Sequence, residues 1–268
     1  MTLPLLFLMP SIIAAVLAGF VCSTMGTFVV RMNISSIGYC MSHAAFAGAA
    51  FGILFSIDPM ISAVAFAFIT ALILGPLSEK ARLESNIVMG FLFSVMIALG
   101  FIFLSLKPGE AATGQALRIL WGSLFSVTYN DVLLLLLLSF AMLVFVTIFF
   151  KELVAVMFHR KLAESAGINT KLFYFSVLFL TGFAVSLSLK LVGGLLVFAL
   201  IVNPSSTAYQ FFYDFKKILI FSPLIGVISC VTGYYMSLVL DFPIGASIVI
   251  ISALFFAFAI VISPKRRK

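Results

Sequence analysis

The side chain best placed to do chemistry is His43, because it lies in the middle of a long apolar stretch. Cys40 precedes it by three residues and Tyr39 by four, a spacing that predicts all three side chains on one face of a helix. An imidazole beside a thiol or a phenol can bind a transition metal transiently. The alternative is a buried histidine that only hydrogen-bonds a neighbouring helix. Spacing alone leaves both interpretations open.

The element that carries these residues belongs to a very hydrophobic chain. Of 268 residues, 63% are hydrophobic and 9% are charged, and the mean hydropathy is +1.28. A water-soluble domain does not have this composition, and the unbroken apolar runs lack the alternation of a membrane β-barrel. The sequence therefore predicts an all-α, polytopic protein of the cell membrane, with residues 1–268 forming a single transmembrane domain.

The number of crossings follows from the apolar segments, since a crossing needs about 20 apolar residues. Nine segments are expected, at about 4–30, 37–56, 59–77, 87–106, 131–150, 172–189, 191–211, 218–240 and 243–263. Eight to ten helices are possible, because residues 117–129 could form a short re-entrant or interfacial helix.

The basic residues predict the orientation of the chain. With the N-terminus outside and the C-terminus cytoplasmic, thirteen of the 16 Lys and Arg residues fall on the cytoplasmic side, which is the bias of membrane proteins. These residues are scattered at the ends of apolar segments and form no aromatic-interleaved patch, so lipid is expected as a partner and nucleic acid is not.

The longest cytoplasmic connection, at about 151–171, has the features of a short amphipathic helix. It contains helix-forming residues of mixed charge, with Phe158, Leu162 and Ala163 at helical spacing, and Gly167 suits a helix C-cap. The alternative is a solvated connector.

Two further patterns predict helix geometry. Ala44, Gly48 and Gly52 recur every four residues, which allows close packing of another helix from the same chain or from a second chain. Asn203 and Pro204 interrupt another apolar run, which indicates either a broken helix that lines a pathway or an ordinary proline kink.

Motifs for catalysis are missing from the sequence. No pair of carboxylates lies within an apolar segment, and neither a His-Glu-x-x-His motif nor a glycine-rich phosphate loop is present. Asp58 and Asp241 lie beside prolines at segment ends, where turn or cap roles suffice. The chain is therefore not expected to be an enzyme or to hold a permanent cofactor, and any nucleotide would be hydrolysed by another chain.

Several stretches together resemble the integral-membrane permease of the zinc/manganese/iron family of ATP-binding-cassette importers, in the same order across nearly the whole chain. Residues 37–48, with Ser42-His43-Ala44, are similar to the family motif Gly-Asp-x-x-Ser-His-Ala-x-x-Pro-Gly. The other similar stretches are Ile119 to Leu124, Phe158 to Gly167, Val192 to Val197 leading to Pro204 and Ala208, and Asp241 to Gly245.

The resemblance implies a homodimeric or pseudodimeric pore that passes a divalent metal, delivered by an extracytoplasmic binding protein, when two cytoplasmic ATPase subunits close. It implies that His43 is the pore histidine and that residues 158–167 dock on the ATPase. Two departures stand out: Tyr39 replaces the metal-binding Asp of the family, and His159-Arg160-Lys161 replaces its Asp-Pro-Glu.

The donor atoms bear on the choice of metal. Cys40 with His43 favours zinc over the harder manganese and iron, so an ATP-driven importer of zinc is expected first, and of manganese or iron next. A secondary transporter would need a coupling-ion carboxylate within the membrane, and none is evident. A vestigial or regulatory membrane protein remains an alternative, because Tyr39 removes the expected carboxylate.

Overall fold

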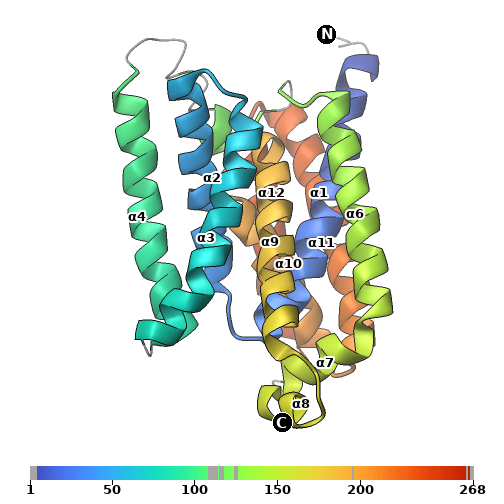
Figure 1. Cartoon of the computed structure of the whole chain (residues 1–268). Coiled ribbons are helices and arrows are strands. Elements are labelled where there is room, and N and C mark those ends of the chain that lie inside the picture. The colour runs from blue at the N-terminus through green and yellow to red at the C-terminus, as the bar shows by residue number, and fades with distance from the viewer. Residues whose placement is uncertain are drawn as a thin grey trace.

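The structure, a computed structural model, is a bundle of helices (Figure 1). It describes residues 5–81, 83–107, 114, 118–123, 126–194, 196–263 and 265, and within these residues it contains no strand. The helices are α1 (Leu5–Arg31), α2 (Ser36–Phe55), α3 (Pro59–Ala81), α4 (Ser85–Ser105), α6 (Tyr129–Ile148), α7 (Phe150–Phe158), α8 (Arg160–Ser165), α9 (Thr170–Val192), α10 (Val197–Phe211), α11 (Phe215–Leu240) and α12 (Ile244–Ile262). The all-helical prediction is confirmed.

Eight of the described helices are long and apolar enough to cross a membrane. The helix α10, with 15 residues, reaches only about 22 Å against a hydrocarbon core of about 30 Å. The sequence placed the break before this helix near Lys190, whereas α9 continues to Val192 and the break begins at Gly193. In the stretch 117–129, residues 118–121 form a helical turn, and 117, 124 and 125 lie outside the described residues. The count of about nine crossings stays a prediction.

Local side chains explain where several helices begin. The Asp58 carboxylate accepts hydrogen bonds from the backbone N–H groups of Met60 and Ile61, at 2.8 and 3.1 Å, and Thr128 and Asp131 form a capping box at the start of α6. Asp241 has φ +54° after the end of α11. Asp58 and Asp241 therefore have the cap and turn roles expected from the sequence.

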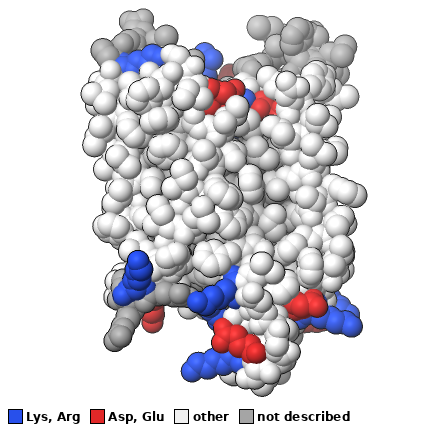
Figure 2. Space-filling view, in the orientation of Figure 1, with Lys and Arg blue, Asp and Glu red and all other residues white. Residues whose placement is uncertain are grey.

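The charged side chains of the visible face gather at the two ends of the bundle, and its middle shows none (Figure 2). Within the bundle, α1 packs on α11, α10, α6 and α9, whereas α2 packs on α4, α3, α9 and α10. The helix α4 stands at one edge (Figure 1) and contacts α2 and α3. The helix that carries His43 is thus interior, although one of its neighbours is peripheral.

Small residues bring α1, α10 and α11 into close contact. A Cβ atom on Gly26 would lie 2.0 Å from the Ile201 carbonyl oxygen, and one on Gly226 would lie 1.9 Å from the Ser23 hydroxyl. The Ser205 and Ser222 hydroxyls donate to the Ser23 carbonyl at 3.1 and 2.8 Å. We call Gly19, Ser23, Gly26, Ser205, Ser222 and Gly226 the serine–glycine junction; such small residues hold membrane helices together at short distance.

Candidate functional site

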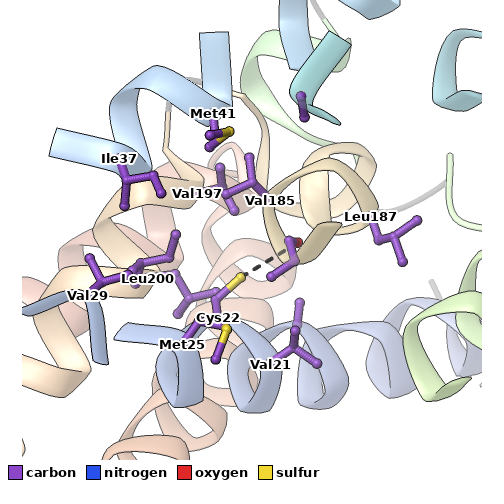
Figure 3. Close-up of a cluster of buried hydrophobic side chains, with 14 of the residues drawn as sticks. Val21, Cys22, Met25, Val29, Ile37, Met41, Val185, Leu187, Val197 and Leu200 are labelled. Carbon is purple, nitrogen blue, oxygen red and sulfur yellow. Dashed lines mark hydrogen bonds between the residues drawn. The ribbon is translucent and has the colours of Figure 1, made fainter. Parts of the chain in front are cut away.

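The helix α2 presents different residues to its different neighbours. Ile37 and Met41 point into the apolar core, among side chains of α1, α9 and α10 (Figure 3), and Cys40 is fully buried in the same core. The side chain of Tyr39, by contrast, is 43% exposed. The sequence placed Tyr39, Cys40 and His43 on one face, but the structure separates the thiol from the phenol because consecutive helix residues point about 100° apart.

His43 is buried, with 4% of its surface exposed. Its Nδ1 atom lies 2.9 Å from the Tyr39 carbonyl oxygen. Because a carbonyl oxygen only accepts hydrogen bonds, Nδ1 carries the proton in the neutral ring, and Nε2 keeps the lone pair. The backbone thus orients the imidazole with Nε2 as the nitrogen able to bind a metal, as orienting hydrogen bonds do for metal-binding histidines.

One aromatic ring meets the imidazole, and two meet the ring of Tyr39. The ring of Phe93 in α4 meets the His43 ring edge-on, with the centroids 4.5 Å apart, and meets the Tyr39 ring at 6.3 Å. The Tyr39 ring also stacks on Phe198 of α10 at 3.8 Å. We call Tyr39, His43, Phe93 and Phe198 the aromatic cluster. Within the described residues, no group of three or more His, Cys, Asp or Glu side chains gathers to hold a metal ion.

The small residues of α2 serve contacts within the chain. A Cβ atom on Gly48 would lie 2.3 Å from the Ser62 carbonyl oxygen, and one on Gly52 would lie 2.9 Å from the Pro59 Cα atom, so both glycines let α3 approach. Ala44 is buried in a small cluster with Ala47 and Met96 of α4. The sequence had left open whether these residues pack within the chain or between two chains.

The Asn203–Pro204 pair lies inside α10, which continues through the proline. A proline cannot bond the carbonyl four residues earlier, and the Ser23 hydroxyl donates to that carbonyl, of Leu200, at 3.2 Å. The Asn203 amide donates to the Ser252 hydroxyl of α12 at 3.1 Å. Of the two interpretations left open by the sequence, a helix broken at this pair is not what the structure shows, since the interruption precedes α10.

Glycines allow the backbone at the break between α9 and α10 to pack closely on residues 118–123. Gly122 and Gly193 have φ values of +77° and +91°, and a Cβ atom on Gly122 would lie 2.1 Å from the Leu191 carbonyl oxygen. The Gly194 N–H donates to the Ile119 carbonyl at 2.8 Å, and the Ser123 N–H donates to the Lys190 carbonyl at 3.0 Å. The two segments thereby satisfy each other's backbone groups, as they must within a membrane.

An ion pair beside this break was missed at the sequence level. Lys190, expected in an outer connection, lies in α9, and its ammonium donates to the Asp131 carboxylate of α6 at 2.8 Å. A nearby pocket of about 210 Å³ is lined by Ile53, Asp58, Pro59, Arg118, Ile119, Ser126 and Lys190. The available signal was Asp131 itself, a carboxylate at the start of an apolar run.

The connection at 151–171 forms two short helices instead of the single helix expected. The helix α7 ends at Phe158, His159 has an extended backbone, and α8 begins at Arg160. Phe158 and Leu162 are 52% and 67% exposed, whereas Ala163 is only 3% exposed and belongs to the main core. Ala163 therefore does not present its side chain on the outer face predicted for it.

The C-terminal end of α8 is capped at Gly167, as the sequence predicted. Gly167 has φ +82°, and the N–H groups of Gly167 and Ile168 donate to the carbonyls of Glu164 and Ala163, each at 3.0 Å, which is a Schellman motif. The Thr170 hydroxyl donates to the Glu164 carboxylate. This hydrogen bond, with help from nearby Arg160, holds the pKa of Glu164 below its ordinary value.

Comparison with known proteins identifies the family. Residues 5–263 match the ABC 3 transport family. The chain is 30% identical over 261 residues to the manganese transport system membrane protein MntC of Listeria monocytogenes, covering 97% of this chain and 92% of that protein. It is 29% identical to a probable iron transport system membrane protein of Haemophilus influenzae, covering 97% and 91%.

A solved structure has the same fold over nearly the whole chain. The chain superimposes on PsaBC from Streptococcus pneumoniae in complex with Fab, with a TM-score of 0.85, 27% identity, and coverage of 97% of this chain and 93% of that one. The match extends from α1 to α12, and the apolar helices make the protein a multi-pass protein of the plasma membrane. The chain belongs to the ABC 3 transport family and is a permease of the ATP-binding-cassette metal importers.

Proposed function

We propose that this chain forms the transmembrane path of an ATP-driven importer and that His43 contacts the divalent metal during transit. The observation that supports this proposal is the hydrogen bond from His43 Nδ1 to the Tyr39 carbonyl, at 2.9 Å, because it leaves the Nε2 lone pair available for a metal. A single imidazole holds a divalent ion weakly. A weak site suits a transport path, because an ion held tightly would not leave it.

The metal that we propose is a divalent transition metal, with manganese ahead of iron. The names of the relatives above support this order. The sequence favoured zinc through Cys40 beside His43, but Cys40 faces the apolar core and Tyr39 lies on the more exposed side. The Tyr39 phenol offers an oxygen, a harder donor atom than sulfur, so the argument for zinc is weaker than the sequence suggested.

The partners that we propose are those implied by the family. A cytoplasmic ATPase would supply the energy for alternating access, a second permease would complete the pore, and an extracytoplasmic binding protein would deliver the metal. For the ATPase, the exposed side chains of Phe158 and Leu162 offer the docking surface. The guanidinium of Arg31, 4.4 Å from the centre of the Phe158 ring, links that surface to the end of α1.

Metal uptake tests the role of His43. Cells that lack their own copy of the permease would express it with its ATPase and binding protein, and uptake of radiolabelled manganese, iron and zinc would be measured separately. We expect His43→Ala to lower uptake at least about tenfold, as losing a metal contact does. Ser42→Ala is the matched control, because its hydroxyl bonds only the Gly38 carbonyl of its own helix, at 2.7 Å.

Normal uptake by His43→Ala would remove His43 from the path and leave the family assignment intact. If the unaltered chain moved none of the three metals, the vestigial or regulatory interpretation would replace that of an importer.

Co-purification of the ATPase tests the docking surface. Leu162→Arg places a charge on an exposed apolar position and is expected to lower ATPase recovery at least about fivefold, since buried apolar anchors dominate interfaces. Lys161→Gln, at the neighbouring exposed position, is the control. Ala163 is unsuitable for this test, because an arginine there would disturb the core of the permease itself. Full ATPase recovery with Leu162→Arg would reject this surface.

A further inference from the structure

A small hollow lies between α3, α4, α8 and α9, at the end of the bundle that carries the predicted cytoplasmic loop. Its volume is about 40 Å³, and it is lined by Gly75, Ser78, Ser85, Arg160, Lys171, Tyr174 and Phe175. Gly75 leaves room for the Phe175 ring, since a Cβ atom on Gly75 would lie 2.2 Å from that ring. The hollow contains neither the aromatic cluster nor Phe158 and Leu162.

The hollow contains a polar group whose bonding is incomplete. The Tyr174 hydroxyl is buried and makes no hydrogen bond of normal geometry in the described part of the chain, although the Ser85 hydroxyl lies near it. The Ser78 hydroxyl, in contrast, donates to the Leu83 carbonyl at 2.9 Å. A buried hydroxyl without a partner is costly, so a ligand with an acceptor atom would complete the site.

Positive charge dominates the hollow. Arg160 and Lys171 line it, and the Arg160 guanidinium carbon lies 5.5 Å from the centre of the Tyr174 ring. The Nε atom of Arg160 is 3.5 Å from the carboxylate of Glu164, whose side chain is 51% exposed and also accepts a hydrogen bond from Thr170. Because α4 and α9 both begin here, at Ser85 and Thr170, the positive ends of two helix dipoles add to this charge.

The surroundings place the hollow at a membrane surface. Leu83, Ile87 and Leu172 lie within two residues of its lining residues in the chain and are 46%, 55% and 58% exposed, as expected for side chains that face hydrocarbon. Charged side chains of both signs lie around this end of the bundle (Figure 2). A basic pocket between membrane helices at the cytoplasmic surface has the chemistry to bind lipid phosphate groups.

We propose that this hollow binds the phosphate group of an anionic phospholipid from the inner leaflet. Arg160 and Lys171 pair with the phosphate oxygens, and the Tyr174 hydroxyl donates a hydrogen bond to one of them. The acyl chains lie outside the bundle along the exposed apolar side chains of α3 and α4. This site depends on the predicted orientation but on neither the transported metal nor His43.

Lipid binding to the purified full-length chain tests the proposal. Phosphatidylglycerol and phosphatidylcholine would each be titrated into the protein in detergent, and the bound lipid would be counted by native mass spectrometry. We expect phosphatidylglycerol to bind more tightly, and Arg160→Gln and Lys171→Gln each to weaken its binding about fivefold. Lys161→Gln removes a neighbouring charge that does not line the hollow, and it should bind as the unaltered chain does.

A second variant keeps the test decisive if the charge changes disturb folding. Tyr174→Phe removes only the hydroxyl and is expected to weaken binding about twofold or more. Equal binding of the two lipids, or an equal loss with Lys161→Gln, would overturn the proposal. Inorganic phosphate is the third arm: if phosphate alone binds with the same dependence on Arg160 and displaces the lipid, the ligand is a free phosphate and the lipid assignment is wrong.

Discussion

The serine–glycine junction and the aromatic cluster both join membrane helices, but they hold those helices together in opposite ways. In the junction, a Cβ atom added at Gly26 would overlap the backbone of α10, and hydroxyls of α10 and α11 bond the same carbonyl of α1. In the aromatic cluster, α2 meets α4 and α10 through ring edges and faces. Backbone contact leaves no freedom to slide, whereas rings can reorient with little loss of contact.

This difference bears on how the proposed transport path would open without loss of the fold. The helices α1, α10 and α11 would move as one unit, since their mutual positions are fixed by atoms that cannot rotate away. The helix α4 packs on α2 through aromatic side chains such as Phe93 and Phe101 and through the small cluster of Ala44, Ala47 and Met96. Because α4 stands at the edge of the bundle, it would be the more easily displaced neighbour of His43 (Figure 1).

The largest expected effect comes from a methyl group at the junction. Gly26→Ala places a Cβ atom 2.0 Å from the Ile201 carbonyl oxygen, whereas a Cβ atom on Gly90, in α4, would meet nothing within 4 Å. Both changes gain helix propensity of up to about 1 kcal/mol, so the difference in stability between the two variants measures the clash of the added methyl group with α10. We expect Gly26→Ala to lose about 1–3 kcal/mol or more, measured by thermal unfolding of the purified proteins, while Gly90→Ala loses none. If Gly26→Ala and Gly90→Ala unfolded at the same temperature, the junction would not be the rigid contact described above.

A smaller effect on stability, but a clear one on transport, is expected in the aromatic cluster. Phe93→Leu keeps most of the side-chain volume, so it should cost less than about 1.5 kcal/mol of folding stability. It also removes the ring that meets both His43 and Tyr39, and uptake should fall about threefold or more. The control is Phe91→Leu, because Phe91 is 58% exposed on the same helix. If Phe93→Leu unfolded as readily as Gly26→Ala, the cluster would be a structural element like the junction.

The sequence predicted much of the fold, because long apolar segments and their caps are local properties. It located the helix that contains His43 and the roles of Asp58 and Asp241. It misplaced the end of α9, since Lys190 looked like a loop residue when its partner, Asp131, was 59 residues away. A charge that is neutralised by a distant residue cannot be recognised from its neighbours in the chain.

The site was harder to predict than the fold, for a geometric reason. Tyr39 and Cys40 are both near His43 by helical spacing, but they diverge on either side of it, and only the packing of α4, α9 and α10 decides which one faces the core. The same holds for Ala163, which matched a surface pattern but is buried. Spacing fixes the angle between side chains on a helix, and tertiary contacts decide what each of them meets.

The break between α9 and α10 also imposes an order on biosynthesis. Backbone groups at and beside the break bond Ile119, Ser123 and Ser126, and the Ser126 hydroxyl that donates to the Lys190 carbonyl precedes that lysine by 64 residues. At about 5–20 residues per second, the earlier segment leaves the ribosome several seconds before the break is made. The acceptors and donors that the break requires are therefore already in the membrane when it arrives, and the interrupted helix need not pass through a state with unbonded backbone in lipid.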